Sequence, residues 1–239
     1  MSHAMSHVAG IDGTPDGWAA VIMEANRALI RKFCSFSNIF DAASDFDVIA
    51  VDIPIGLLDA YEVGGRVCDR VARQILGRPR GSSVFPAPIR PVLAATTWED
   101  ACARSRASAA DGKAVTKQTF GILPKIREVD ELLRMRPELR DVVREVHPEV
   151  SFSELVGIPM MHHKASPLGR DERRRALVRS FPELHLIEKA GRDQGLPIDD
   201  VLDATVACWT ALRMVGGKAR SLPNVAPFDA TGLPMAIWV

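Results

Sequence analysis

The sequence predicts an α/β fold in which helices flank a mixed sheet of parallel and antiparallel strands. Apolar runs at 8–12, 18–23 and 28–36 are separated by turn residues, which predicts three consecutive antiparallel strands. A short helix over 37–44 then precedes a buried strand over 47–54. Because a helix between two such strands implies a right-handed crossover, the sheet is expected to be mixed.

The rest of the chain predicts mainly helices. Residues 57–139 are less regular and are interpreted as a helical insertion at the sheet edge, with helices near 66–76, 97–108 and 122–136. The core then resumes with a strand over 142–147 and helices over 151–156, 170–181, 184–190 and 199–215. We expect a disordered leader over 1–7 and a single domain over 8–239.

Composition indicates a globular protein. The 239 residues are 47% hydrophobic, which is enough for a sizeable core. Thirty basic and thirty acidic residues cancel, so any nucleic-acid binding must be local. No apolar run reaches the roughly 18 residues of a membrane helix and no secretory signal is recognisable, so we expect a cytoplasmic protein without a membrane partner. The four cysteines contain no Cys-x-x-Cys pair, which argues against a zinc site.

Two acids stand at the ends of apolar strands. Asp12 closes Val-Ala-Gly-Ile-Asp, and Asp52 closes a similar run before Ile53-Pro54. Strand ends in an α/β sheet face the crevice where ligands bind, so the two carboxylates converge if the strands are neighbours. Two adjacent carboxylates are costly to keep ionised unless a cation shares them, which favours Mg²⁺ or Mn²⁺. Alternatively, each aspartate caps a turn.

A third acidic element opens the last predicted helix. Asp200 and Asp203 are three residues apart and share one helix face, whereas Asp199 is the natural N-cap. Asp200 alternatively complements the helix dipole. The residues after Asp203 are apolar almost all round the helix, so this carboxylate is expected to be buried with a partner.

Glu145, His147 and Glu149 lie at alternate positions. In a strand, the first two share a face, where a glutamate could complete a metal site and a histidine could bind phosphate. For Glu145, a polar edge face is an equal alternative. Pro148 breaks a continuing strand, so Glu149 is predicted at an exposed junction and is the better candidate.

Basic residues cluster twice. Arg66, Arg70 and Arg73 recur at helical spacing and form a candidate phosphate-binding stripe, although a solvated helix surface is the commoner explanation. The second cluster is interleaved with Asp171 and Glu172 and is interpreted as a salt-bridged surface; it comprises Arg170, Arg173, Arg174 and Arg175. The loop residues His162, His163 and Lys164 lack the spacing of metal ligands.

These segments together resemble domain-of-unknown-function family 429, a family of predicted nucleases with a ribonuclease H-like fold. The resemblance covers roughly Gly10 to Arg213, and its pieces follow one another in order. They are Gly10-Ile11-Asp12-Gly13 with Gly17-Trp18, Val51-Asp52-Ile53-Pro54-Ile55-Gly56-Leu57, Cys68-Asp69 with Arg73, Ser83-Val84-Phe85-Pro86, Gln118, Lys125, Glu128-Val129-Asp130, Glu145-Val146-His147-Pro148-Glu149-Val150-Ser151-Phe152 and Asp200-Val201-Leu202-Asp203-Ala204.

The resemblance implies a ribonuclease H-like mixed five-stranded sheet with flanking helices. The family is similar to Holliday-junction resolvases, in which acids on the first strand, the fourth strand and the last helix bind metal. A two-metal phosphodiester hydrolysis follows from that likeness. The expected catalytic residues are Asp12, Asp52, Glu149, Asp200 and Asp203, with Asp12, Asp52 and Asp203 as metal ligands and Arg66, Arg70, Arg73, Lys125 and His147 toward the substrate.

The substrate class stays open among DNA, RNA and a small phosphoester, and so does the oligomeric state, with a homodimer among the alternatives. Two other functions remain. Asp12-Gly13-Thr14 and Gly216-Gly217 superficially fit an actin-like ATP-binding phosphotransferase, but such folds need two like domains and Gly216 follows a helix as an ordinary cap. A non-catalytic binding scaffold is the other alternative, since only 6% of the residues are aromatic and no single-strand stacking platform is evident.

Overall fold

The computed structural model describes residues 6–24, 27–43 and 45–239, and it divides into two compact units. The first unit comprises the chain up to Ile53 together with Asp141–Arg220 and Trp238–Val239. The second comprises Pro54–Arg140 and Ser221–Ile237. Where we expected a single domain with an insertion over 57–139, that segment thus joins a C-terminal stretch in a compact unit with its own core.

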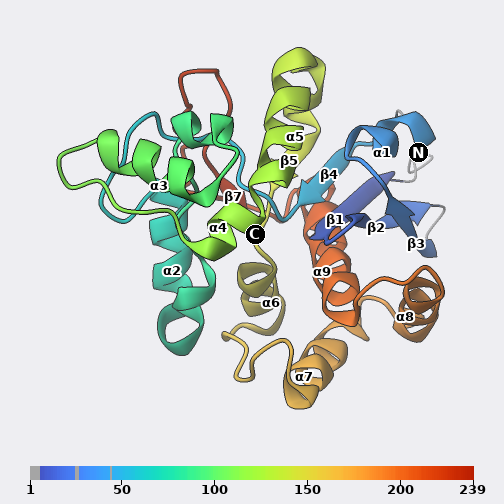
Figure 1. The fold of residues 1–239 in the computed structure, drawn as a ribbon. Coiled ribbons are helices and arrows are strands. Elements are labelled where there is room, and N and C mark those ends of the chain that lie inside the picture. Colours follow the sequence, from blue (N-terminus) through green and yellow to red (C-terminus); the bar gives the residue numbers. More distant parts are fainter. Residues whose placement is uncertain (1–5, 25–26, 44) are drawn as a thin grey trace. The chain divides into compact units, whose positions relative to one another are not determined.

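A five-stranded mixed sheet forms the centre of the first unit (Figure 1). Its strands lie in the order β3-β2-β1-β4-β5, with β2 antiparallel to both β1 and β3, and β4 parallel to both β1 and β5. They span Val8–Thr14 (β1), Gly17–Glu24 (β2), Arg27–Phe33 (β3), Val48–Val51 (β4) and Val143–Glu145 (β5). The predicted mixed α/β sheet is confirmed.

Helices flank this sheet. They are α1 (Ser37–Ala42), α6 (Pro148–Val156), α7 (Pro167–Leu177), α8 (Leu184–Asp193) and α9 (Ile198–Val215). Helix α9 packs against β1, β4 and β2, while α6, α7 and α8 pack against α9 (Figure 1). The apolar pattern that predicted a buried last helix therefore places α9 directly on the sheet.

Gly10 allows α9 to approach β1 closely. A Cβ atom at this position would lie 1.9 Å from the backbone nitrogen of Cys208 and 2.3 Å from the carbonyl oxygen of Ala204. Since both are backbone atoms, the whole helix would have to move to accept a side chain. Gly10 thereby fixes the distance between the strand that carries Asp12 and the helix that carries Asp203.

We expect Gly10→Ala to destabilise the protein by about 3 kcal/mol or more, the upper end of the usual cost of overpacking. Urea denaturation followed by circular dichroism measures this change. Gly121→Ala is the matched control, because a Cβ there meets no atom within 4 Å. Equal midpoints for Gly10→Ala and the control would contradict the proposed close packing.

Helices dominate the second unit. They are α2 (Val67–Arg80, kinked at Gly77–Arg78), α3 (Trp98–Ala107), α4 (Lys117–Gly121) and α5 (Leu123–Met135), with 3-10 turns η1 (Gly81–Ser83), η2 (Arg90–Ala94) and η3 (Pro137–Asp141). Two short strands, β6 (Ser221–Leu222) and β7 (Ile237–Trp238), pair with each other. Its core contains Ile89, Val92, Ala95, Ala101, Cys102, Val115 and Leu123.

A buried ion-pair network joins the C-terminal stretch to the helices of this unit. The Arg90 guanidinium lies 2.9 Å from Asp130 and also contacts the Asp229 carboxylate. Asp229 in turn accepts a hydrogen bond from the backbone nitrogen of Leu57 (3.0 Å). Burial raises the pKa of Asp229, but these hydrogen bonds outweigh it and hold the pKa below its ordinary value. Asp229 is therefore a structural anion.

Only the last part of the predicted leader over 1–7 falls within the described residues. Residues 1–5 lie outside the described residues. His7, in contrast, donates its backbone N–H to Asp47 (2.9 Å) and stacks its ring on Phe46. These contacts tie His7 to the segment that leads into β4.

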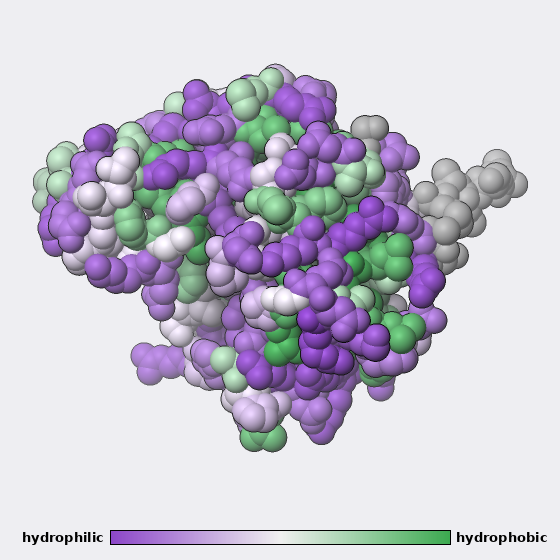
Figure 2. All heavy atoms as spheres, turned by 45° about the vertical axis from the view of Figure 1, so that its right-hand side comes forward, coloured by the Kyte–Doolittle hydropathy of each residue, from purple (hydrophilic) through white to green (hydrophobic). Residues whose placement is uncertain are grey.

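The face drawn in Figure 2 carries hydrophilic residues over most of its area, with hydrophobic residues in separate areas. Within residues 6–24, 27–43 and 45–239, no helix combines the length and the apolar character needed to cross a membrane.

Candidate functional site

Asp12 and Asp52 lie side by side at the carboxyl ends of two neighbouring strands in the first unit. Strands β1 and β4 are parallel, and Ile11 is paired with Val51, so the two aspartates follow at equivalent positions. The backbone nitrogen of Asp52 donates to the carbonyl oxygen of Ile11 at 3.0 Å. Asp12 is only 7% exposed. The convergence expected from two acidic strand ends is therefore present.

Helix α9 brings a third carboxylate to the same place. Asp203 is 2% exposed, as expected for an acid on a helix that is apolar almost all round. Asp200 lies in the first turn of α9 and its charge acts on Asp12. Asp199 is not the N-cap that we predicted: the helix begins at Ile198 after Pro197, and Asp199 pairs with Arg170 at 2.8 Å.

The charges of these acids act on one another. Burial, followed by the negative charges of Asp52 and Asp203, raises the pKa of Asp12 well above its ordinary value. Burial and the charge of Asp203 raise the pKa of Asp52 to about 7. Such mutual effects require the three carboxylates to share a poorly solvated site. We call Asp12, Asp52 and Asp203 the carboxylate cluster.

A lysine that the sequence did not single out reaches this cluster. The Nζ atom of Lys164 donates to Oδ2 of Asp203 at 2.6 Å. Burial lowers the pKa of Lys164, but the charges of Asp203, Asp12 and Asp52 outweigh it and raise the pKa overall, so the amine is an ammonium ion. Its sequence context, a loop after two histidines, carries no ligand spacing that would have revealed it.

Glu149 is buried, which corrects the exposed junction predicted for it. Pro148 does not expose the chain but occupies the first turn of α6, where its missing N–H costs nothing. Glu149 is 7% exposed and pairs with Arg173, which is 1% exposed. Its charge nevertheless contributes to the raised pKa of Asp52. Arg173 therefore belongs to the interior and not to the salt-bridged surface expected for its cluster.

The two other polar residues of this segment occupy different positions. Glu145 is buried on β5, and His147 is half-buried at the N-cap of α6. The alternation of side chains between the two faces of a strand ends with β5. Glu149 lies in the first turn of α6, which begins at Pro148, so its side chain follows the geometry of a helix.

The basic residues expected to face the substrate lie in the second unit, except His147. Arg66 precedes α2, is buried and pairs with Asp69 at 2.7 Å. Arg70 donates to the carbonyl of Gly65, and Arg73 donates to the carbonyls of Gly64 (2.6 Å) and Val84 (2.7 Å). Lys125 is half-buried on α5. The three arginines therefore hold loops of their own unit in place instead of forming a solvated stripe.

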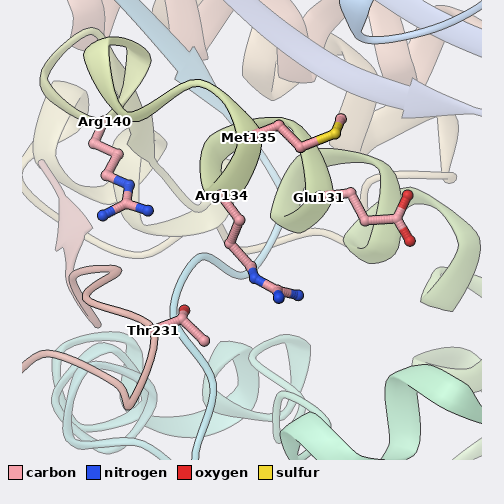
Figure 3. Close-up of a pocket in the computed structure, with 5 residues that line it drawn as sticks. All are labelled: Glu131, Arg134, Met135, Arg140 and Thr231. Atoms are coloured by element: carbon pink, nitrogen blue, oxygen red, sulfur yellow. The ribbon is translucent and has the colours of Figure 1, made fainter.

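A separate pocket of about 360 Å³ lies in the second unit (Figure 3). It is lined by Glu131, Arg134, Met135, Arg140 and Thr231. Both arginines of the pocket already interact with groups of the protein: Arg140 donates to the carbonyl of Leu133 at 2.9 Å, and Arg134 lies 3.5 Å from Asp130. We therefore assign the candidate chemistry to the carboxylate cluster and not to this pocket.

The raised pKa values predict how stability depends on pH in the metal-free protein. A carboxyl group whose pKa is higher in the folded than in the unfolded state is bound more tightly to its proton in the folded state. Its contribution to the free energy of unfolding is therefore present at low pH and is lost as the pH rises. For Asp52 this window runs from about 4, the unfolded value, to about 7. Asp52→Asn should therefore gain stability over the wild type as the pH increases from 5 to 8.

Urea denaturation in EDTA at both pH values measures this difference. Lys32 pairs with the exposed Asp16, so Asp16→Asn serves as the control, for which no such gain is expected. A stability difference between Asp52→Asn and the wild type that stays constant from pH 5 to pH 8 would contradict the burial of a charged cluster.

Comparison with known proteins gives one positive result. Neither a curated protein nor a solved structure matches the chain. A sequence model of a family described as "Protein of unknown function (DUF429)" matches residues 10–227. This range includes the whole carboxylate cluster, Glu149 and Lys164, and it agrees with the resemblance inferred from the sequence. Because the match covers most of the chain, the protein belongs to the family DUF429.

Proposed function

We propose that this protein is a metal-dependent nuclease or phosphodiester hydrolase whose first unit has a ribonuclease H-like fold. The observation that carries the proposal is the meeting of Asp12, Asp52 and Asp203 from β1, the end of β4 and α9. The sheet order, with β1 and β4 parallel at its centre, supports the proposed fold. The substrate classes that fit are DNA, RNA and a small phosphoester.

The donor set fits Mg²⁺ or Mn²⁺. Both ions prefer carboxylate oxygens, and the cluster offers carboxylates alone. Among the described residues, Oε2 of Glu149 is also a buried oxygen without a hydrogen-bond partner. Burying several acids together is unfavourable unless cations neutralise them, as the raised pKa values of Asp12 and Asp52 indicate. Asp12, Asp52 and Asp203 would hold the metal, with Glu149 and Asp200 next to them.

The chain's own residues contribute position and charge. A metal bound in this site would supply an activated water and would stabilise the leaving oxygen of a phosphodiester. Asp12 and Asp52 are fixed by the sheet register, and Asp203 is fixed by the contact of α9 with Gly10. Arg173 neutralises Glu149 and holds it in the interior. The site is therefore preorganised by rigid elements of the first unit.

The experiment that tests this function is a crystal structure after a Mn²⁺ soak, examined for anomalous density beside Asp12, Asp52 and Asp203. Density there, together with Mn²⁺-dependent cleavage in a screen of branched, single-stranded and small phosphodiester substrates, is the expected result. No density at high Mn²⁺ concentration, with carboxylates that point apart, would overturn the proposal. Thermal stabilisation by ATP but not by Mn²⁺ alone would favour an ATP-binding phosphotransferase instead.

A further inference from the structure

Lys164 carries a positive charge into the carboxylate cluster from the loop that joins α6 and α7. Its ammonium contacts Asp203, and its charge also acts on Asp12 and Asp52. The Lys164 side chain is 43% exposed, whereas that of Asp203 is 2% exposed. The lysine thus reaches from the partly exposed loop to a buried acid.

Helix α7 holds this loop in position. The Glu172 carboxylate accepts hydrogen bonds from the backbone nitrogens of Met161 (2.8 Å) and His162 (3.0 Å). The Arg173 guanidinium donates to the carbonyl oxygen of His162 at 3.2 Å. These contacts are made by the charged run that the sequence suggested was a salt-bridged surface. They fix the backbone immediately before Lys164.

The far side of the loop is fixed as well. The hydroxyl of Ser166 donates to the carbonyl of His163 at 2.7 Å and accepts from the backbone nitrogen of Gly169 at 3.0 Å. A Cβ atom on Gly169 would lie 2.0 Å from the His163 carbonyl oxygen, so only glycine permits this approach. Lys164 therefore stands between two anchored positions, and its direction toward the cluster is built into the fold.

We propose that Lys164 is one of two cations in the site, so that the carboxylate cluster binds a single divalent ion beside the lysine ammonium. This inference rests on the proposed metal-dependent function and replaces the two-metal hydrolysis that the family resemblance implied with a site for one ion. The charges support it: one ammonium and one divalent ion neutralise the three negative charges of Asp12, Asp52 and Asp203. Glu149 has its own counter-charge in Arg173. A second divalent ion would have to compete with the Lys164 ammonium for Asp203, which that ammonium contacts at 2.6 Å.

The stoichiometry of Mn²⁺ binding tests the inference. We would titrate the full-length protein with MnCl₂ by isothermal calorimetry and count bound ions by electron paramagnetic resonance. The wild type is expected to bind one ion in the cluster. Lys164→Met keeps the length of the side chain without its charge, and it should bind a second ion. Lys164→Arg restores the charge and should return the stoichiometry to one.

Lys189→Met is the matched control, because Lys189 pairs with Asp193 on the surface of α8 and should leave one ion bound. Two ions in the wild type, or one ion in a folded Lys164→Met variant, would overturn the role of Lys164 while the metal-dependent function stands. No bound ion in any of these proteins would overturn the metal-dependent function itself. Circular dichroism confirms that each variant is folded before titration.

Discussion

Asp12→Asn is expected to lower the affinity for Mn²⁺ by more than about 100-fold without unfolding the protein. The loss should exceed the ~10–100-fold that follows when a residue merely supporting a metal ligand is removed, because Asp12 is itself a proposed ligand. The metal-free variant should be at least as stable as the wild type near pH 8. Burial and the negative charges of Asp52, Asp203 and Asp200 raise the pKa of Asp12, so the asparagine removes a charge that the fold disfavours.

Isothermal calorimetry with MnCl₂ measures the affinity, and urea denaturation in EDTA measures the stability. Asp16→Asn is the control, since the exposed Asp16 lies in the turn of the same hairpin and pairs with Lys32 at 2.7 Å. That variant should bind Mn²⁺ as the wild type does. Wild-type affinity in Asp12→Asn would remove Asp12 from the metal site. A loss shared by both variants would instead point to damage of the hairpin.

The carboxylate cluster was predictable because its members follow from local patterns. Asp12 and Asp52 each end an apolar strand, and parallel strands that end together bring such residues to one edge. Asp203 lies in a helix whose surroundings are apolar, so its burial and its need for a partner could be inferred from spacing alone.

The residues that surround the cluster were not predictable in the same way. The position of Lys164 depends on a loop whose backbone is held by Glu172 and Arg173, and these two residues reach the loop only because of how α7 packs. Proline was interpreted as a break before Glu149, although it can equally begin a helix, and only tertiary structure decides between these. In both cases the side chain's role depends on residues that are distant in sequence.

The arginine stripe shows a further limit of spacing arguments. Arg66, Arg70 and Arg73 recur as they would on one helix face, and the helix is present. Their guanidinium groups nevertheless bind Asp69 and loop carbonyls of the second unit, because folded loops offer acceptors that the sequence does not reveal. Helical periodicity predicts which side chains share a helix face. It does not predict whether those side chains are solvated or form hydrogen bonds with the backbone of nearby loops.

The largest loss of stability is expected from Arg173→Met, at about 3–5 kcal/mol, the usual cost of breaking a buried ion pair from one side. The substitution leaves the Glu149 charge without its partner in the interior and removes the donor to the His162 carbonyl. Arg175→Met is the control on the same helix: its pair with Asp171 is exposed, so a change below about 1 kcal/mol is expected. Urea denaturation compares the two variants.

A double variant separates the two roles of Arg173. Glu149→Gln combined with Arg173→Met removes both buried charges, so it should recover part of the stability that Arg173→Met loses. It should not restore the hydrogen bond to the loop before Lys164, because methionine has no donor for the His162 carbonyl. Full recovery would show that Arg173 serves only to neutralise Glu149. Partial recovery, with Mn²⁺ stoichiometry altered as in Lys164→Met, would show that Arg173 also holds the lysine in the cluster.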